Sequence, residues 1–171
     1  MTEESKDKNQ IKTEYFDKMA PEWDTIIGND EKRKAIIKNI INTMGLTSGM
    51  NVLDVGCGTG ITVSVIHDQI SPKGKITAID PSAEMIKEAQ KNFNNLTNVT
   101  WKVGLLEETK FKKNEFDVII AFAVFPHIDD KPAALKVMRH CLKKDGKLFI
   151  FHLSDTKSLN NFHRTLDAPV K

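Results

Sequence analysis

Three glycines stand close together in the stretch VLDVGCGTG, residues 52–60, at positions 56, 58 and 60. A glycine inside a strand or helix costs about 0.5–1 kcal/mol relative to alanine, so such a cluster indicates a local requirement. Glycines let the chain turn sharply after an apolar run, and they let a ligand approach the backbone without interference from Cβ atoms. We therefore interpret this turn as a ligand-binding loop.

A carboxylate follows this loop at a defined distance. The run KITAID, residues 75–80, ends in Asp80, twenty residues after Gly60. At the carboxyl edge of a parallel sheet, a carboxylate can accept hydrogen bonds from both hydroxyls of a ribose. Loop, strand and acid together predict a ligand that contains adenosine. In the alternative interpretation, Asp80 only caps the helix that follows.

Three histidines follow the later apolar runs: His127, His152 and His163. If they converge on one pocket, one of them could act as a general base toward a hydroxyl or thiol, because the pKa of imidazole lies near neutrality. Two or three could instead bind a metal ion, but no tight spacing such as HxxxH supports this, and we expect no metal. In the third interpretation they form structural hydrogen bonds or orient a substrate.

Five short runs rich in β-branched and aromatic residues predict the strands that position these groups. They are residues 51–56, 75–80, 98–103, 116–122 and 147–153. Residues 29–44 have apolar side chains at helical spacing, and Ser82 and Asp129 or Asp130 can cap two further helices. This alternation predicts an α/β fold with a mostly parallel open sheet of about five strands and helices on both faces. Ligands of such sheets bind beyond the carboxyl ends of the strands.

The composition restricts the classes of function. The 171 residues carry a formal net charge of +2, so the chain can bury one core and has no broad basic field for nucleic acid. No apolar run reaches the roughly 18 residues of a membrane span, and the start of the chain lacks the apolar core of a signal peptide. Together with two cysteines, Cys57 and Cys141, expected as free thiols, these features favour a cytoplasmic protein that binds neither nucleic acid nor membrane. We expect residues 1–10 to be disordered and residues 11–171 to form one domain.

The spacing of the glycines separates two classes of ligand. A dinucleotide-binding loop has the pattern GxGxxG, whereas this chain has GxGxG and Ile61 at the last position, so a nicotinamide-dependent reductase is a distant alternative. With Asp54 two residues before the first glycine, VLDVGCGTG resembles the first motif of the class I S-adenosylmethionine-dependent methyltransferases. The resemblance covers residues from about 15 to 163 and includes AIDPSAEMI, FDVIIAFAVFPHIDDKPAAL and LKKDGKLFIFH.

The resemblance implies a Rossmann-like methyltransferase fold, S-adenosylmethionine as cofactor and S-adenosylhomocysteine as product. Gly56, Gly58 and the loop backbone would face the methionine part of the cofactor. Asp54 would either contact the ammonium group of the cofactor or only hold the loop. The implied cofactor-binding residues are Asp54, Gly56, Cys57, Gly58, Gly60, Asp80, Pro81, Met85, Gly104, Leu105 and Ala121.

At the adenosine end, the resemblance implies that Asp80 holds the ribose and that Pro81 or Met85 lies near adenine. In many relatives, Gly-Asp follows the third strand and the acid reaches the adenine amino group. This chain has Gly104-Leu105 instead. Backbone groups or a nearby acid would therefore have to replace that contact.

The N-terminal stretch TEYFDKMAPEWD, residues 13–24, resembles a segment that covers the cofactor in small-molecule methyltransferases of the quinone-biosynthesis type. Tyr15, Phe16 and Trp23 would form an apolar face at helical spacing. This face could close over a ligand as a lid, which we assign to residues 11–28, or it could pack on the sheet as core.

The acceptor of the methyl group is less defined. The sequence AFAVFPH stands where enzymes that methylate base amines carry an Asn/Asp-Pro-Pro-aromatic motif, and no Pro-Cys pair exists for cytosine C5 chemistry. We expect a small-molecule acceptor with an O, S, N or C nucleophile left open. The alternative is a module that binds S-adenosylmethionine or S-adenosylhomocysteine with little turnover, because the C-terminal strand hairpin of the family has no counterpart here.

Without that hairpin, the strand expected at 147–153 would form an apolar edge of the sheet, and an open edge invites pairing with another chain. We therefore expect either a homodimer through this edge or coverage of the edge by the tail, residues 154–171.

Overall fold

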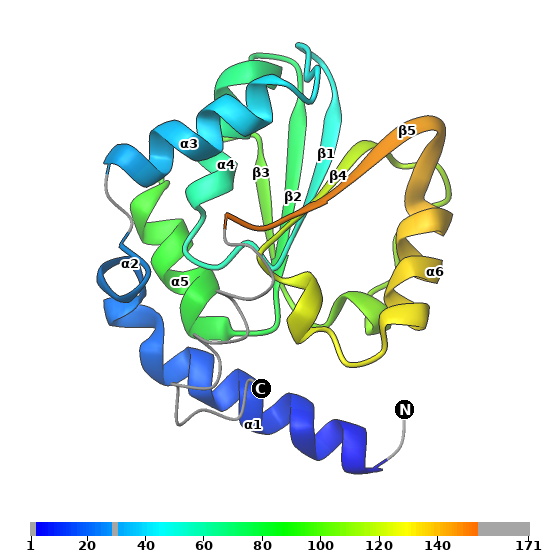
Figure 1. Cartoon of the computed structure of the whole chain (residues 1–171). Coiled ribbons are helices and arrows are strands. Elements are labelled where there is room, and N and C mark those ends of the chain that lie inside the picture. Colours follow the sequence, from blue (N-terminus) through cyan, green and yellow to red (C-terminus); the bar gives the residue numbers. More distant parts are fainter. Residues whose placement is uncertain (1–2, 29–30, 154–171) are drawn as a thin grey trace.

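The computed structural model describes residues 3–28 and 31–153. Five strands form one sheet in the order β3-β2-β1-β4-β5 (Figure 1). All four neighbouring pairs are parallel, so the α/β fold class expected from the sequence is confirmed. The strands are β1 (Asn51–Val55), β2 (Lys75–Asp80), β3 (Val99–Val103), β4 (Phe116–Phe122) and β5 (Leu142–Phe151).

Helices cover both faces of the sheet, as expected. On one face lie α3 (Glu31–Asn42), α4 (Ile61–Ile70) and α5 (Ala83–Asn92), and on the other lies α6 (Lys131–Cys141) (Figure 1). Each face has its own buried apolar cluster: Ile37 and Ile66 belong to the first, and Ile119 and Met138 to the second. Because both faces are covered, the central strands are almost continuously apolar. Their buried charged side chains are Asp54 in β1 and Asp80 at the end of β2.

The caps expected for two helices are present. The Ser82 side chain accepts a hydrogen bond from the backbone N–H of Met85 at the start of α5. At the start of α6, Asp130 accepts one from Ala133, so the second of the two candidate aspartates is the cap. These caps fix where the chain leaves the carboxyl ends of β2 and β4.

The N-terminus differs from the disorder expected for residues 1–10. Helix α1 spans Glu3–Met19, and a short 3₁₀ turn, η1 (Ala20–Glu22), and α2 (Trp23–Ile26) follow it. The first residues are rich in Glu, Lys and Gln, which favour helices, and a helix that is already packed extends at little cost. Asn9 in α1 is buried, so the helix is anchored on the domain near its start.

Strand β5 begins earlier than expected. Residues 143–146, which precede the strand expected at 147–153, already lie within β5, where the pairing with β4 shifts register between Phe116 and Val118. Asp117, between these two positions, accepts a hydrogen bond from Lys143 Nζ at 2.7 Å. Between these two pairs β5 has more residues than β4, and a bulge together with the Lys143–Asp117 ion pair accommodates them within the strand. β5 is an edge strand of the described sheet, whereas the tail at 154–171 lies outside the described residues.

Two short 3₁₀ segments complete the connections: η2 (Leu106–Glu108) after β3 and η3 (Phe125–His127) after β4. In the part of the chain that the structure describes, no helix has the length and apolar character needed to cross a bilayer.

Candidate functional site

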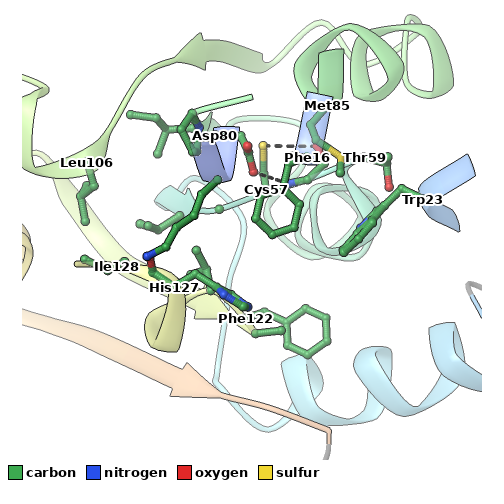
Figure 2. Close-up of a pocket in the computed structure, with 18 of the residues that line it drawn as sticks. Phe16, Trp23, Cys57, Thr59, Asp80, Met85, Leu106, Phe122, His127 and Ile128 are labelled. Atoms are coloured by element: carbon green, nitrogen blue, oxygen red, sulfur yellow. Dashed lines mark hydrogen bonds between the residues drawn. The ribbon is translucent and has the colours of Figure 1, made fainter. Parts of the chain in front are cut away.

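A pocket of about 390 Å³ opens at the carboxyl ends of the strands. The loops after β1, β2 and β4 form its base, and residues of α1 and α2 form its roof (Figure 2). Both its size and its place at this edge are typical of ligand sites in open parallel sheets.

The glycine loop after β1 forms one wall. Gly56 has φ of +65°, and a Cβ atom on it would lie 2.2 Å from Val124 Cγ2 in the loop after β4. Both the backbone conformation and the close approach of the two loops therefore require glycine. Gly58 and Cys57 also line the pocket.

Gly60 is needed for a different reason than the one expected. It lies outside the pocket lining, and its Cβ would sit 2.8 Å from the ring of Phe93 at the end of α5. Its φ of +90° ends the loop and starts α4 at Ile61. Gly60 thus shapes the turn by packing against α5, and the described geometry gives it no contact with the pocket.

Asp80 closes the loop from the side of β2. Its Oδ2 accepts a hydrogen bond from the Gly58 N–H, and its Oδ1 accepts one from the Ser82 N–H, both at 2.9 Å. Each carboxylate oxygen keeps a further lone pair for a ligand hydroxyl. Asp80 is 8% exposed and lines the pocket, and burial raises its pKa to about 6 despite these two hydrogen bonds.

Asp54 lies beneath the loop and does not line the pocket. It is 1% exposed and accepts a hydrogen bond from the Thr62 hydroxyl in the first turn of α4. Burial, and to a lesser extent the neighbouring charge of Asp80, raises its pKa to about 7, while the Thr62 bond lowers it. Of the two roles left open for Asp54, this geometry matches the one in which it holds the loop.

The opposite wall comes from the loops after β2 and β3. Pro81, Met85, Gly104 and Leu105 all line the pocket, as expected. Glu107 lines it too, and burial raises the pKa of its carboxyl group. An acid is therefore present at the pocket, two residues beyond Leu105. Leu105 itself stands at the position directly after Gly104 for which the resemblance implied an acid.

The aromatic residues of the N-terminal segment form the roof. Phe16 makes edge-to-face contacts with Tyr15 and Trp23, each with ring centroids 5.5 Å apart, and all three line the pocket. Phe16 also contacts the His127 ring at 5.9 Å (Figure 2). The roof thus joins the loop after β4 while it covers the loop after β1.

Residues 46–168 of this chain match the family described as "Methyltransferase domain". The chain belongs to this family. The methyltransferase resemblance of VLDVGCGTG and its companion motifs is confirmed.

Two curated relatives support the assignment of the methyltransferase domain. An uncharacterized methyltransferase of Staphylococcus carnosus is 34% identical over 144 residues, which are 80% of this chain and 65% of that protein. The demethylmenaquinone methyltransferase of Staphylococcus aureus is 28% identical over 156 residues, 90% of this chain and 64% of that protein. The chain thus spans slightly less than two thirds of the length of these relatives.

Solved structures have the same fold as the methyltransferase domain. An S-adenosylmethionine-dependent methyltransferase from Aquifex aeolicus is 28% identical with a TM-score of 0.63, and the match covers 67% of this chain and 62% of that one. The DhpI protein, solved with S-adenosylhomocysteine, has a TM-score of 0.72 at 22% identity, over 87% of this chain and 71% of that one.

Two of the three candidate histidines line the same pocket. His127 comes from η3 and His152 follows β5, and both line the cavity. His163 lies outside the described residues. Within residues 3–28 and 31–153, no group of three His, Cys, Asp or Glu side chains could hold a metal ion.

Ala121, like Asp54 and Gly60, lies outside the pocket lining. It is fully buried in β4, where it pairs with Val55. The residues after it, Phe122, Ala123 and Val124, form this wall instead. Ala123 has φ of +58°, a strained conformation for alanine, at the point where β4 ends against the pocket.

Two basic residues of the site were missed from the sequence. Arg33 on α3 lines the pocket with its guanidinium carbon 5.8 Å from the centroid of the Phe122 ring. Lys12 on α1 lines it too and pairs with Asp129. Both stand in ordinary amphipathic or polar stretches, so nothing local distinguishes them from lysines and arginines on the surface.

Proposed function

We propose that the protein transfers a methyl group from S-adenosylmethionine to a small-molecule acceptor. The observation that carries this proposal is the arrangement of the Asp80 carboxylate and the glycine loop on one pocket of a methyltransferase domain. The residues present fit this cofactor: Gly56 and Gly58 border the pocket with backbone alone, and Asp80 retains acceptor sites for ribose hydroxyls.

The cofactor would supply a methyl group on a positively charged sulfur. Asp80 would accept the ribose hydroxyls, and the backbone of Gly56 and Gly58 would face the methionine part. Arg33 would pair with the cofactor's carboxylate, because it lines the pocket and its guanidinium lies beside the Phe122 ring. Glu107 could accept a hydrogen bond from the adenine amino group.

The acceptor would lie on the side of β4 and β5, near His127 and His152. A lone pair of the acceptor atom forms the new bond to the methyl carbon, and the electrons of the broken bond stay on sulfur. One of the two histidines would remove the proton of a hydroxyl or thiol acceptor. The aromatic roof of Tyr15, Phe16 and Trp23 would keep water out and hold the reacting atoms in line.

A titration tests this proposal. S-adenosylmethionine and S-adenosylhomocysteine should bind with micromolar affinity, NAD should not bind, and Asp80→Ala should abolish binding. A methyl-transfer screen should then include thiols, phenols and amines, together with demethylmenaquinone, the compound named for the Staphylococcus aureus relative. Absence of binding to the wild-type protein would overturn the proposal.

The second candidate is a cofactor-binding module with little turnover. It would use the same pocket, with the same glycine loop and Asp80, so cofactor binding is common to both candidates. The same screen separates the two functions, because a module would bind S-adenosylhomocysteine but leave every acceptor unmethylated.

Two further expectations belong to this proposal. Both cysteines of the chain, Cys57 and Cys141, are buried free thiols, which suits activity in the reducing cytoplasm.

The edge strand β5 exposes Ile150, which suits pairing with a second copy. Light scattering would decide between a dimer and a monomer.

A further inference from the structure

The roof carries two aspartates as well as its aromatic residues. Asp24, in α2, accepts a hydrogen bond from the Thr59 hydroxyl at 2.6 Å. Thr59 stands between Gly58 and Gly60 and is 4% exposed, so this bond ties the roof directly to the glycine loop.

Asp17, in α1, binds the other loop. Its Oδ1 accepts a hydrogen bond from the Ser82 hydroxyl at 2.6 Å and one from the Glu84 N–H at 3.1 Å. Both donors belong to the start of α5, so Asp17 acts as a second cap supplied from a distant helix. The residues that it joins are more than 60 positions apart in the sequence.

These bonds form a continuous path around the pocket. Asp17 holds the Ser82 hydroxyl, and the Ser82 N–H holds Asp80. Asp80 in turn holds the Gly58 N–H, and the next residue, Thr59, leads back to the roof through Asp24. The roof is thus bonded to the same two loops that would contact the cofactor.

We propose that Asp17 and Asp24 are positioning residues that hold the two cofactor-binding loops through the roof, so that docking of the roof and binding of the cofactor are coupled. This inference rests on the proposed function, because it assigns the ligand of these loops. Coupling is reciprocal: a docked roof tightens cofactor binding, and a bound cofactor stabilises the docked roof.

Substitutions of Asp17 separate positioning from charge and from folding. Asp17→Ala removes the acceptor of both hydrogen bonds, whereas Asp17→Asn keeps an oxygen that can accept them. We expect Asp17→Ala to bind S-adenosylhomocysteine about tenfold more weakly than wild type and Asp17→Asn to restore affinity to within about threefold. Glu14→Ala, an exposed change on the same helix, should leave affinity unchanged. Asp24→Ala and Asp24→Asn should behave as the Asp17 pair does.

A measurement on the wild-type protein covers the case in which an alanine variant fails to fold. Hydrogen exchange at backbone amides of residues 11–28 should slow when S-adenosylhomocysteine is added. Wild-type protein that binds S-adenosylhomocysteine without slower exchange in this segment would overturn the coupling. Folded alanine variants with the affinity of Glu14→Ala would overturn it as well. Wild-type protein that does not bind the ligand refutes the proposed function and this inference with it.

Discussion

Gly56 faces Val124 so closely that a Cβ atom on residue 56 would lie 2.2 Å from Val124 Cγ2. This contact joins the loop after β1, which would hold the cofactor, to the loop after β4, which would face the acceptor. Gly56→Ala should therefore abolish S-adenosylhomocysteine binding. It should also lower the free energy of unfolding by more than about 1–2 kcal/mol, which is the cost of the left-handed conformation for alanine alone. Isothermal titration and urea unfolding would measure both effects.

Gly49→Ala is the matched control for this substitution. Gly49 has φ of +93°, and the nearest atom to a Cβ there lies at 3.9 Å, so the variant has the backbone strain without the clash. Reducing the clash in Gly56→Ala/Val124→Ala should recover part of the stability. Equal losses for Gly49→Ala and Gly56→Ala would contradict the role of the close contact.

The affinity for S-adenosylhomocysteine should depend on pH through Asp80. Its pKa is raised to about 6 by burial, so the carboxyl group is ionised at pH 7.5 and mostly protonated at pH 5. Because ribose hydroxyls donate to the ionised form, affinity should fall roughly tenfold between these two values. Titrations across this range should give a sloped profile for wild type and a flatter one for Asp80→Asn. Parallel profiles would contradict the assignment.

The stability of the ligand-free protein should show the opposite trend because of Asp54. The pKa of this group is raised from 3.8 to about 7, so its contribution is complete below about pH 4 and is lost as the pH rises through 7. Asp54→Asn can still accept the Thr62 hydrogen bond and should be more stable than wild type at pH 8, by on the order of 1–3 kcal/mol. At pH 4 the two proteins should be similar. Urea unfolding at both pH values would measure this, and a constant difference would contradict it.

Arg33 should contribute to cofactor affinity. Arg33→Gln removes the charge beside Phe122, and we expect S-adenosylhomocysteine to bind about tenfold more weakly. Lys38→Gln removes one exposed charge from the same helix and should bind like wild type. Titrations at two salt concentrations would compare the affinities of the two variants. Equal affinities would contradict a role of Arg33 in cofactor binding.

His127 should affect turnover more than binding. With an acceptor found in the screen, His127→Gln should lower kcat about 100-fold, because glutamine cannot take the proton, while S-adenosylhomocysteine affinity stays within about threefold. His140→Gln, an exposed change on α6, should be neutral. Unchanged turnover in His127→Gln would leave the base role to His152.

The wall of the pocket that we assign to the cofactor could be predicted from the sequence because its signals are local. The glycines, Asp80 and Met85 lie at or just beyond strand ends, and parallel strands bring those ends to one edge. Gly60 was expected at the cofactor and is seen to pack against Phe93, because a glycine required by a neighbouring ring looks the same in the sequence as one required by a ligand.

The contacts of the roof could not be predicted in the same way. Asp17 and Asp24 accept hydrogen bonds from residues 65 and 35 positions away, and Arg33 on α3 contacts Phe122 at the end of β4. Such contacts depend on the packing of α1 to α3 and leave no periodic pattern. The early start of β5 likewise depends on the pairing of Lys143 with Asp117.

The order of the strands divides the pocket into two parts that come from separate stretches of the sequence. Residues 51–80 alone, from β1 to β2, supply the glycine loop and Asp80, whereas the wall after β4 comes from a separate stretch that pairs with the far side of β1. Under the proposed function, sequence changes after β4 and β5 would therefore alter which acceptor fits while the stretch that would face adenosine stays intact. New acceptor specificities would then evolve on this scaffold without changes in residues 51–80, provided that residue 124 still fits against Gly56.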